Sequence, residues 1–241
     1  MDTVNLDLID RKILSELDNN ARISYSTLGK QIRVAKETVK YRISSLEKIG
    51  VIKGYYTLVD FSKLGFVFYR TYIRLQNTPP EIEQKIAEYL SGSKNVAIFY
   101  QINGAYHIAL GVWAKNLWKY EEFWLNFKNK FGQYFSNCHF SILTEYVEFS
   151  RSYLLANNTN EKTSFMTISK SDSENLDSMD FKLLSYLSNN ARVSIVDIAT
   201  ALKTSIVTVR YRMKNLIDKK VITGFRTIFD LSKLGKEYYK V

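Results

Sequence analysis

The feature that most constrains the fold of this chain is an internal repeat. Residues 6–65 align with residues 176–235 at a constant shift of 170 and without a gap. About 26 of the roughly 60 aligned positions are identical, which is far more than chance gives. Asn-Asn-Ala-Arg, Tyr-Arg and Ser-Lys-Leu-Gly recur in both copies. The repeat predicts one structural module that occurs twice, with a segment of different character between the copies.

Each copy begins with a pattern typical of two short helices. In the first copy, apolar residues at helical spacing predict a helix over residues 8–17. Asn19-Asn20-Ala21-Arg22 closes that helix, and Ser24 is a good N-cap for a second helix that runs to residue 32. A tight turn then leads to a third helix.

The third helix and the residues after it complete the module. The helix is predicted over residues 34–48, and Gly50 ends it as a residue that can take a positive φ. Residues 51–60 follow as a short β-rich wing with a glycine turn. Two helices, a tight turn, a third helix and a wing form the order of a winged helix-turn-helix, whose third helix enters the major groove of DNA.

The third helix has one apolar face and one basic, hydroxyl-rich face. Val39, Ile43 and Leu46 fall in one narrow sector and should dock on a core. The second copy repeats the centre of this helix as Thr208-Val209-Arg210-Tyr211-Arg212. Each copy therefore predicts a DNA recognition helix, and the alternative is an ordinary amphipathic helix in a protein-interaction domain.

The candidate DNA-binding residues are polar side chains on or next to these two helices. They are Lys36, Glu37, Thr38, Lys40, Tyr41, Arg42, Ser45, Lys48 and Lys53 in the first copy, and Ser205, Thr208, Arg210, Tyr211 and Arg212 in the second. In the first copy the side chains expected to neutralise phosphates are Lys40, Arg42, Lys48 and Lys53, and those expected to contact base edges or the groove are Glu37, Thr38, Tyr41 and Ser45. Tyr41 could instead pack against the wing.

The two copies differ at the start of the recognition helix. Ile206 and Val207 stand where the first copy has Lys36 and Glu37. Apolar side chains can touch thymine methyl groups but cannot form hydrogen bonds, so the second copy should read a different sequence or less of one. Ser205 also gives this helix an N-cap that Ala35 cannot provide.

Net charge supports a nucleic-acid partner. The chain carries a formal charge of +10. About seven basic residues lie in residues 30–53 and about seven more in residues 203–226, with few acidic residues among them. A basic balance alone also fits simple solubility, but its concentration in two matching windows favours phosphate binding.

The segment between the copies has a different pattern. Strands are predicted over residues 66–75, 95–102, 106–113 and 136–149, and helices over residues 78–90 and 116–131. Thr78 and Asn116 are the expected N-caps, and Asn103-Gly104 the hairpin turn. The resulting β-α-β-β-α-β order predicts a ferredoxin-like sandwich, so that the whole chain is α+β.

These patterns divide the chain into five segments. They are a winged helix-turn-helix domain at 1–63, a ferredoxin-like effector and dimerisation domain at 64–156, a polar linker at 157–174, a second winged helix-turn-helix at 175–235, and the start of a truncated second sheet domain at 236–241. Phe165, Met166 and Ile168 interrupt the polar linker and could form a strand against the preceding domain.

The first copy carries a family resemblance. Its motifs resemble those of the Lrp/AsnC transcriptional regulators: Leu6-Asp7-Leu8-Ile9-Asp10, Asn20-Ala21-Arg22, Tyr41-Arg42-Ile43 and Gly50-Val51-Ile52-Lys53-Gly54. The resemblance implies a sequence-specific regulator that binds double-stranded DNA. It also implies a homodimer or higher oligomer formed through the sheet domain, and a small-molecule effector bound there.

Two departures from the family pattern bear on function. The family has an acidic residue at the end of a Gly-x-Tyr/Phe-Asp motif, where this chain has Gly104-Ala105-Tyr106-His107. Gly104, Tyr106 and His107 remain candidates for an effector site, but the change argues against an amino acid as the effector. The tandem arrangement is also unusual for the family.

Other function classes lack their residues. Cys138 is the only cysteine, and His107 and His139 are the only histidines, so neither a disulfide nor a metal site is predicted. No apolar run or leader predicts membrane insertion or export, which suggests a cytoplasmic protein. We expect no cofactor and no enzymatic activity. The alternatives are an enzyme resembling the sirohaem decarboxylases, which share this architecture, and an adaptor that does not bind DNA.

Overall fold

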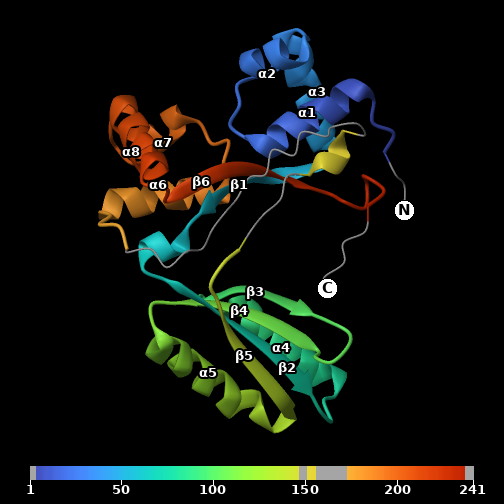
Figure 1. The fold of residues 1–241 in the computed structure, drawn as a ribbon, viewed down its shortest axis with the longest axis vertical. Coiled ribbons are helices and arrows are strands. Elements are labelled where there is room, and N and C mark those ends of the chain that lie inside the picture. Colours follow the sequence, from blue (N-terminus) through green and yellow to red (C-terminus); the bar gives the residue numbers. More distant parts are fainter. Residues whose placement is uncertain (1–3, 147–150, 156–172, 237–241) are drawn as a thin grey trace. The chain divides into compact units, whose positions relative to one another are not determined.

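The computed structural model describes residues 4–146, 151–155 and 173–236, which divide into two compact units. The first unit contains residues 4–60, 151–155 and 175–236, which include the helices of both copies of the repeat, and the second contains residues 61–146 with residues 173–174. Figure 1 labels the helices and strands of both units.

The first unit contains two matching sets of three helices and a strand. The elements of the first copy are α1 (Leu8–Asn19), α2 (Tyr25–Ile32), α3 (Lys36–Lys48) and β1 (Ile52–Val59), and those of the second are α6 (Ser178–Asn189), α7 (Ile195–Ala201), α8 (Ile206–Asp218) and β6 (Ile222–Phe229). Ser24 caps α2 as predicted, by accepting a hydrogen bond from the backbone N–H of Thr27. Gly50 has a φ of +72°, also as predicted. The helix-turn-helix order is therefore confirmed in both copies.

The strand of each copy pairs with the strand of the other. β1 and β6 form a two-stranded antiparallel ladder, instead of each copy folding its own hairpin. The glycine turn expected in residues 51–60 is wrong, because Gly54 lies inside β1 and faces Ile228. A strand of this length needs a partner, and here its partner lies about 170 residues away in the sequence.

The ladder has a pseudo-two-fold register. Ile52 pairs with Phe229, and Val59 pairs with Ile222. Because Ile222 is the repeat equivalent of Ile52, and Phe229 that of Val59, the second pair is the first with the two copies exchanged. At the centre, Tyr56 faces its own equivalent, Arg226. The two modules are thus related as the subunits of a two-fold dimer are, within one chain.

Reciprocal hydrogen bonds follow the same symmetry. The Arg22 guanidinium donates to the backbone carbonyls of Ala191 and Val193, and the equivalent Arg192 donates to those of Ala21 and Ile23. Backbone hydrogen bonds show the same symmetry, because the N–H of Ala21 donates to the carbonyl of Phe225 and the N–H of Ala191 donates to the carbonyl of the equivalent Tyr55. Each module therefore binds the other through an equivalent set of hydrogen bonds.

The symmetry is broken at one buried cluster. Arg226 is 1% exposed and Asp18 is 2% exposed, and their Nη2 and Oδ2 atoms are 2.9 Å apart. Arg151 also pairs with Asp18 and donates to the carbonyl of Thr227 at 2.9 Å. The repeat has Ser188 at the position equivalent to Asp18, so this ion pair exists on one side of the axis only.

The second unit is a four-stranded antiparallel sheet with two helices. Its elements are β2 (Val67–Leu75), α4 (Pro80–Gly92), β3 (Val96–Gln101), β4 (Ile108–Ala114), α5 (Leu117–Phe131) and β5 (Phe135–Leu143), with the sheet order β3-β4-β2-β5. This is the predicted ferredoxin-like order. Alternate β2 residues such as Tyr69 and Ile73 are buried in a core with Leu90 of α4 and Phe127 of α5.

Several boundaries in this unit differ from prediction. Asn116 caps α5 as expected, but Thr78 does not cap α4, because the cap residue is Pro79 and the Thr78 hydroxyl donates to the carbonyl of Gln76. The strand predicted to residue 149 ends at Leu143. The predicted strand end at 147–149, nearly all of the linker and the last five residues of the chain lie outside the described residues.

Candidate nucleic-acid interface

α3 presents the face that the sequence predicted. Val39, Ile43 and Leu46 are buried beneath it. Lys36, Glu37 and Lys40 are exposed, and Tyr41 is 71% exposed, which disfavours packing of this ring against the strand. Among the described residues, no ion pair is found for the exposed side chains of Lys36, Lys40 or Lys48. This surface is therefore available to an anionic partner.

α8 repeats the arrangement with different chemistry at its N-terminus. Val207 is 75% exposed and Ile206 38% exposed, at the positions of Glu37 and Lys36. Ser205 caps the helix by accepting a hydrogen bond from Thr208 N–H at 3.0 Å, and the hydroxyls of the two residues lie 2.8 Å apart. α3 has no side-chain cap at Ala35. Arg210 and Tyr211 are exposed further along α8.

Arg42 and Arg212 have a structural role that the helical pattern did not reveal. Arg42 pairs with Asp7 at 2.8 Å and Asp10 at 3.3 Å, which ties α3 to the start of α1. Arg212 makes the same two contacts with Asp177 and Asp180, both at 2.8 Å. The signal was present in the sequence, because Asp-x-x-Asp opens both copies.

The two capping aspartates show the electrostatic consequence. The pKa of the Asp7 carboxyl is lowered, first by the hydrogen bond that it accepts from the backbone N–H of Asp10 and then by Arg42. The pKa of Asp177 is lowered for the same reasons, by the Asp180 N–H and by Arg212. Both carboxylates stay charged beside their arginines, so each arginine already has an anionic partner.

Two other candidates are also engaged with the protein. Lys53 forms an ion pair with Asp230 at 2.9 Å, which links β1 to the residue after β6. Ser45 is half-buried and lines a hollow between α3 and residues 4–6. The contacts that the sequence predicted for Arg42, Arg212, Lys53 and Ser45 stay predictions, since each side chain would have to keep or exchange a contact within the protein.

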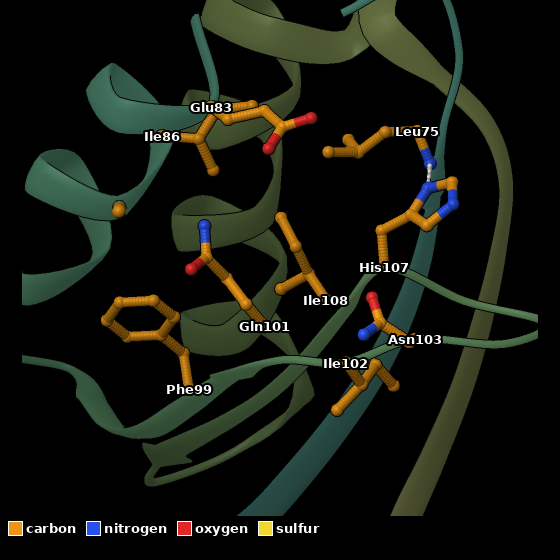
Figure 2. Close-up of a pocket in the computed structure, with 10 residues that line it drawn as sticks. Leu75, Glu83, Ile86, Phe99, Gln101, Ile102, Asn103, His107 and Ile108 are labelled. Carbon is orange, nitrogen blue, oxygen red and sulfur yellow. Dashed lines mark hydrogen bonds between the residues drawn. The ribbon is translucent and has the colours of Figure 1, made fainter. Parts of the chain in front are cut away.

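The second unit contains a pocket of about 260 Å³ between α4 and the β3–β4 hairpin (Figure 2). His107 lines it, and its Nδ1 accepts a hydrogen bond from the backbone N–H of Leu75 at 2.9 Å. The proton of the neutral ring must therefore lie on Nε2. Glu83, Gln101 and Asn103 bring polar groups to the same pocket.

Only one of the three predicted effector residues lines this pocket. Gly104 lies in the hairpin loop with a φ of +140°, and the Tyr106 ring packs beside Tyr72 at a centroid distance of 5.7 Å. Sequence reasoning overlooked Glu83, which lies on α4 and is brought to His107 by the fold alone.

The described residues contain neither a membrane-spanning helix nor a cluster of metal ligands. None of their helices is long and apolar enough to cross a membrane. None of their His, Cys, Asp and Glu side chains form a group of three or more that could hold a metal ion.

Comparison with known proteins identifies both modules. A family model described as winged helix-turn-helix DNA-binding matches residues 6–53 and 176–223. An uncharacterised transcriptional regulator of helix-turn-helix type from Pyrococcus abyssi is 36% identical over 107 residues, which are 44% of this chain and 68% of that protein. The regulator LrpC of Bacillus subtilis is 31% identical over 57% of this chain and 94% of its own length. The chain belongs to the Lrp/AsnC family. It is a DNA-binding transcriptional regulator.

Solved structures agree with this assignment. The structure of Bacillus subtilis LrpC, 29% identical, matches 60% of this Lrp/AsnC protein and 99% of LrpC with a TM-score of 0.51. A structure of the sirohaem decarboxylase NirDL covers more of the protein, 91%, and 65% of its own chain, with a TM-score of 0.63 at 11% identity. At that identity the likeness shows the fold alone.

Proposed function

We propose that one chain of this Lrp/AsnC protein supplies both recognition helices for a single DNA site. The observation that carries the proposal is the β1–β6 ladder, which joins the two helix-turn-helix modules about a pseudo-two-fold axis. Two-fold related recognition helices bind two inverted half-sites, with centres about 34 Å or a multiple apart. In this protein the pairing requires no second chain.

Phosphate contacts would supply most of the affinity, through the exposed lysines and arginine of α3 and α8. We expect Lys40→Ala to reduce the slope of log K against log salt by about 0.9, the value for one lost phosphate contact. Arg42→Met should leave the slope unchanged, because Arg42 is held by Asp7 and Asp10.

Gel shifts on duplexes selected from a random pool, at a series of salt concentrations, measure both slopes. A reduced slope for Arg42→Met would show that this arginine leaves its aspartates to contact DNA. Binding that is indifferent to salt would contradict the proposed interface and favour the adaptor alternative.

Oligomerisation through the sheet domain is a second part of the proposal. The face of the sheet away from α4 and α5 carries partly exposed aromatic residues, among them Phe68, Tyr72 and Trp113. Phe61 stacks on Trp113 at 4.5 Å between ring centroids. A second copy packed on this face would make a dimer with four recognition helices, and light scattering on the free protein tests it.

A small-molecule effector is proposed for the pocket that His107 lines. Glu83, Gln101 and His107 offer hydrogen bonds of both polarities, and Phe99 and Ile86 form an apolar wall. A ligand should raise the thermal midpoint of the wild type but not that of Glu83→Ala. If no compound in a panel of amino acids and other small carboxylates and amines changed the thermal midpoint of the wild type or of Glu83→Ala, the proposed effector site would be contradicted.

Sirohaem chemistry is the competing function, and the likeness to NirDL over 91% of the chain supports the shared fold but not the activity. The relatives identified by sequence are named transcriptional regulators. A Soret band on adding the tetrapyrrole, without any binding to selected DNA, would reverse the assignment.

A further inference from the structure

The two recognition helices are equivalent in position but not in chemistry. The exposed start of α3 carries a cation and a carboxylate, Lys36 and Glu37, whereas the start of α8 carries two exposed aliphatic side chains, Ile206 and Val207. The N-terminal residues of a recognition helix are those that contact base edges. The difference therefore falls where it changes sequence preference most.

Each pair of side chains matches different base pairs. A lysine donates to the O6 and N7 acceptors of guanine, and a glutamate accepts from the N4 amino group of cytosine. Aliphatic side chains gain only by contact with the C5-methyl group of thymine. The module of α3 thus suits G·C pairs, and the module of α8 suits A·T pairs with the methyl group toward Val207.

The protein also contains a feature that keeps unlike modules together. Pairing β1 with β1 of another copy would place each buried Asp18 next to Tyr56, with its contact to Arg151 but without its contact to Arg226. Pairing β6 with β6 would place two Arg226 side chains together beside Ser188. Either like pairing would separate a buried carboxylate from the buried guanidinium that it contacts, which is unfavourable, so the Asp18–Arg226 pair favours the pairing of the first module with the second.

We propose that the protein reads an inverted pair of unlike half-sites and binds in one orientation, with α3 on the half-site that contains G·C pairs and α8 on the half-site rich in thymine. This proposal rests on the paired DNA binding proposed above. It adds that the operator has a direction, because exchanging the two helices would place Lys36 and Glu37 on thymine methyl groups.

Directed cleavage tests the orientation. Cys138 is the only cysteine of the chain, so Cys138→Ser gives a background into which Ser44→Cys or Lys214→Cys introduces one thiol. These are equivalent, exposed positions of α3 and α8 that we do not place in base contact. An iron chelate on the thiol then cleaves DNA nearby, on an operator selected from random duplexes.

We expect the Ser44→Cys conjugate to cleave at one half-site and the Lys214→Cys conjugate at the other. Cleavage at both half-sites by each conjugate would overturn the proposed orientation while leaving paired DNA binding intact. If neither conjugate cleaved the DNA at a defined half-site, paired binding itself would be overturned, and the orientation with it.

Helix-tip exchange tests the chemistry. Ile206→Lys with Val207→Glu gives α8 the start of α3, and should raise affinity about tenfold or more for an operator with two copies of the α3 half-site. The same variant should lose affinity for the selected operator. Lys36→Ile with Glu37→Val is the matched control and should favour two copies of the other half-site. Unchanged preferences in both variants would overturn the assignment of these four residues.

Discussion

Asp18→Ala is expected to lower the free energy of unfolding of the unit that contains the two helix-turn-helix modules by about 3–5 kcal/mol. The loss arises because two arginines, the buried Arg226 and Arg151, lose their ion pairs with the same carboxylate. Arg226→Met should cost less, since Asp18 keeps its contact with Arg151. A larger loss of stability for Asp18→Ala than for Arg226→Met would show that the buried guanidinium depends on the carboxylate more than the carboxylate depends on the guanidinium.

Urea unfolding can follow the two units separately. All three tryptophans, Trp113, Trp118 and Trp124, lie in the sheet unit, so their fluorescence reports that unit and not the paired modules. Far-ultraviolet circular dichroism reports the helices of both. The dichroism transition of Asp18→Ala should move to lower urea while the fluorescence transition stays in place.

The exposed pair of Asp218 with Lys214 provides the control. Exposed ion pairs contribute little, so Asp218→Ala should leave both transitions almost unchanged. If Asp18→Ala behaved like Asp218→Ala, the buried cluster would have no role in pairing the modules.

The second large effect is expected from Arg192→Ala. Arg192 donates to the carbonyls of Ala21 and Ile23, and its guanidinium lies over the rings of Tyr25 and Tyr55 at 5.0 and 5.2 Å. Removing it leaves carbonyls of the first module without their charged donor. We expect a loss of about 2–3 kcal/mol in the stability of the paired unit.

This variant should also affect DNA recognition, because the two helices would no longer be held at a fixed spacing. Affinity for the selected operator should fall more than affinity for random DNA, which depends on phosphate contacts alone. Arg11→Ala, on the exposed face of α1, is the matched control and should change neither the affinity for the selected operator nor the affinity for random DNA. Equal losses on operator and random DNA would mean that Arg192 acts through charge and not through module pairing.

Local patterns predicted most of the secondary structure, because they depend on neighbouring residues. The buried stripe of Val39, Ile43 and Leu46 and the cap at Ser24 follow from helical spacing and hydrogen-bonding chemistry. The β-α-β-β-α-β order of the sheet unit could be read in the same way. The partner of β1 could not, because alternation shows that a segment is a strand but not which strand it pairs with.

Arg226 shows why the pairing was missed. In the sequence it counts as one more cation in a basic window, whereas the fold buries it beneath the ladder against Asp18. The aligned repeat held a clue, since Tyr56 changes to Arg226 and Asp18 changes to Ser188. Two such charge differences between copies suggest an ion pair across the axis, but only once the copies are known to touch.

The central claim is that one chain supplies both recognition helices for one operator. Sedimentation of the protein, saturated with a short duplex that carries one pair of selected half-sites, measures the ratio of chains to duplexes in the complex. Pairing within the chain predicts one chain per duplex, whether or not the sheet domains associate. A ratio of two chains per duplex, each using one module, would contradict it.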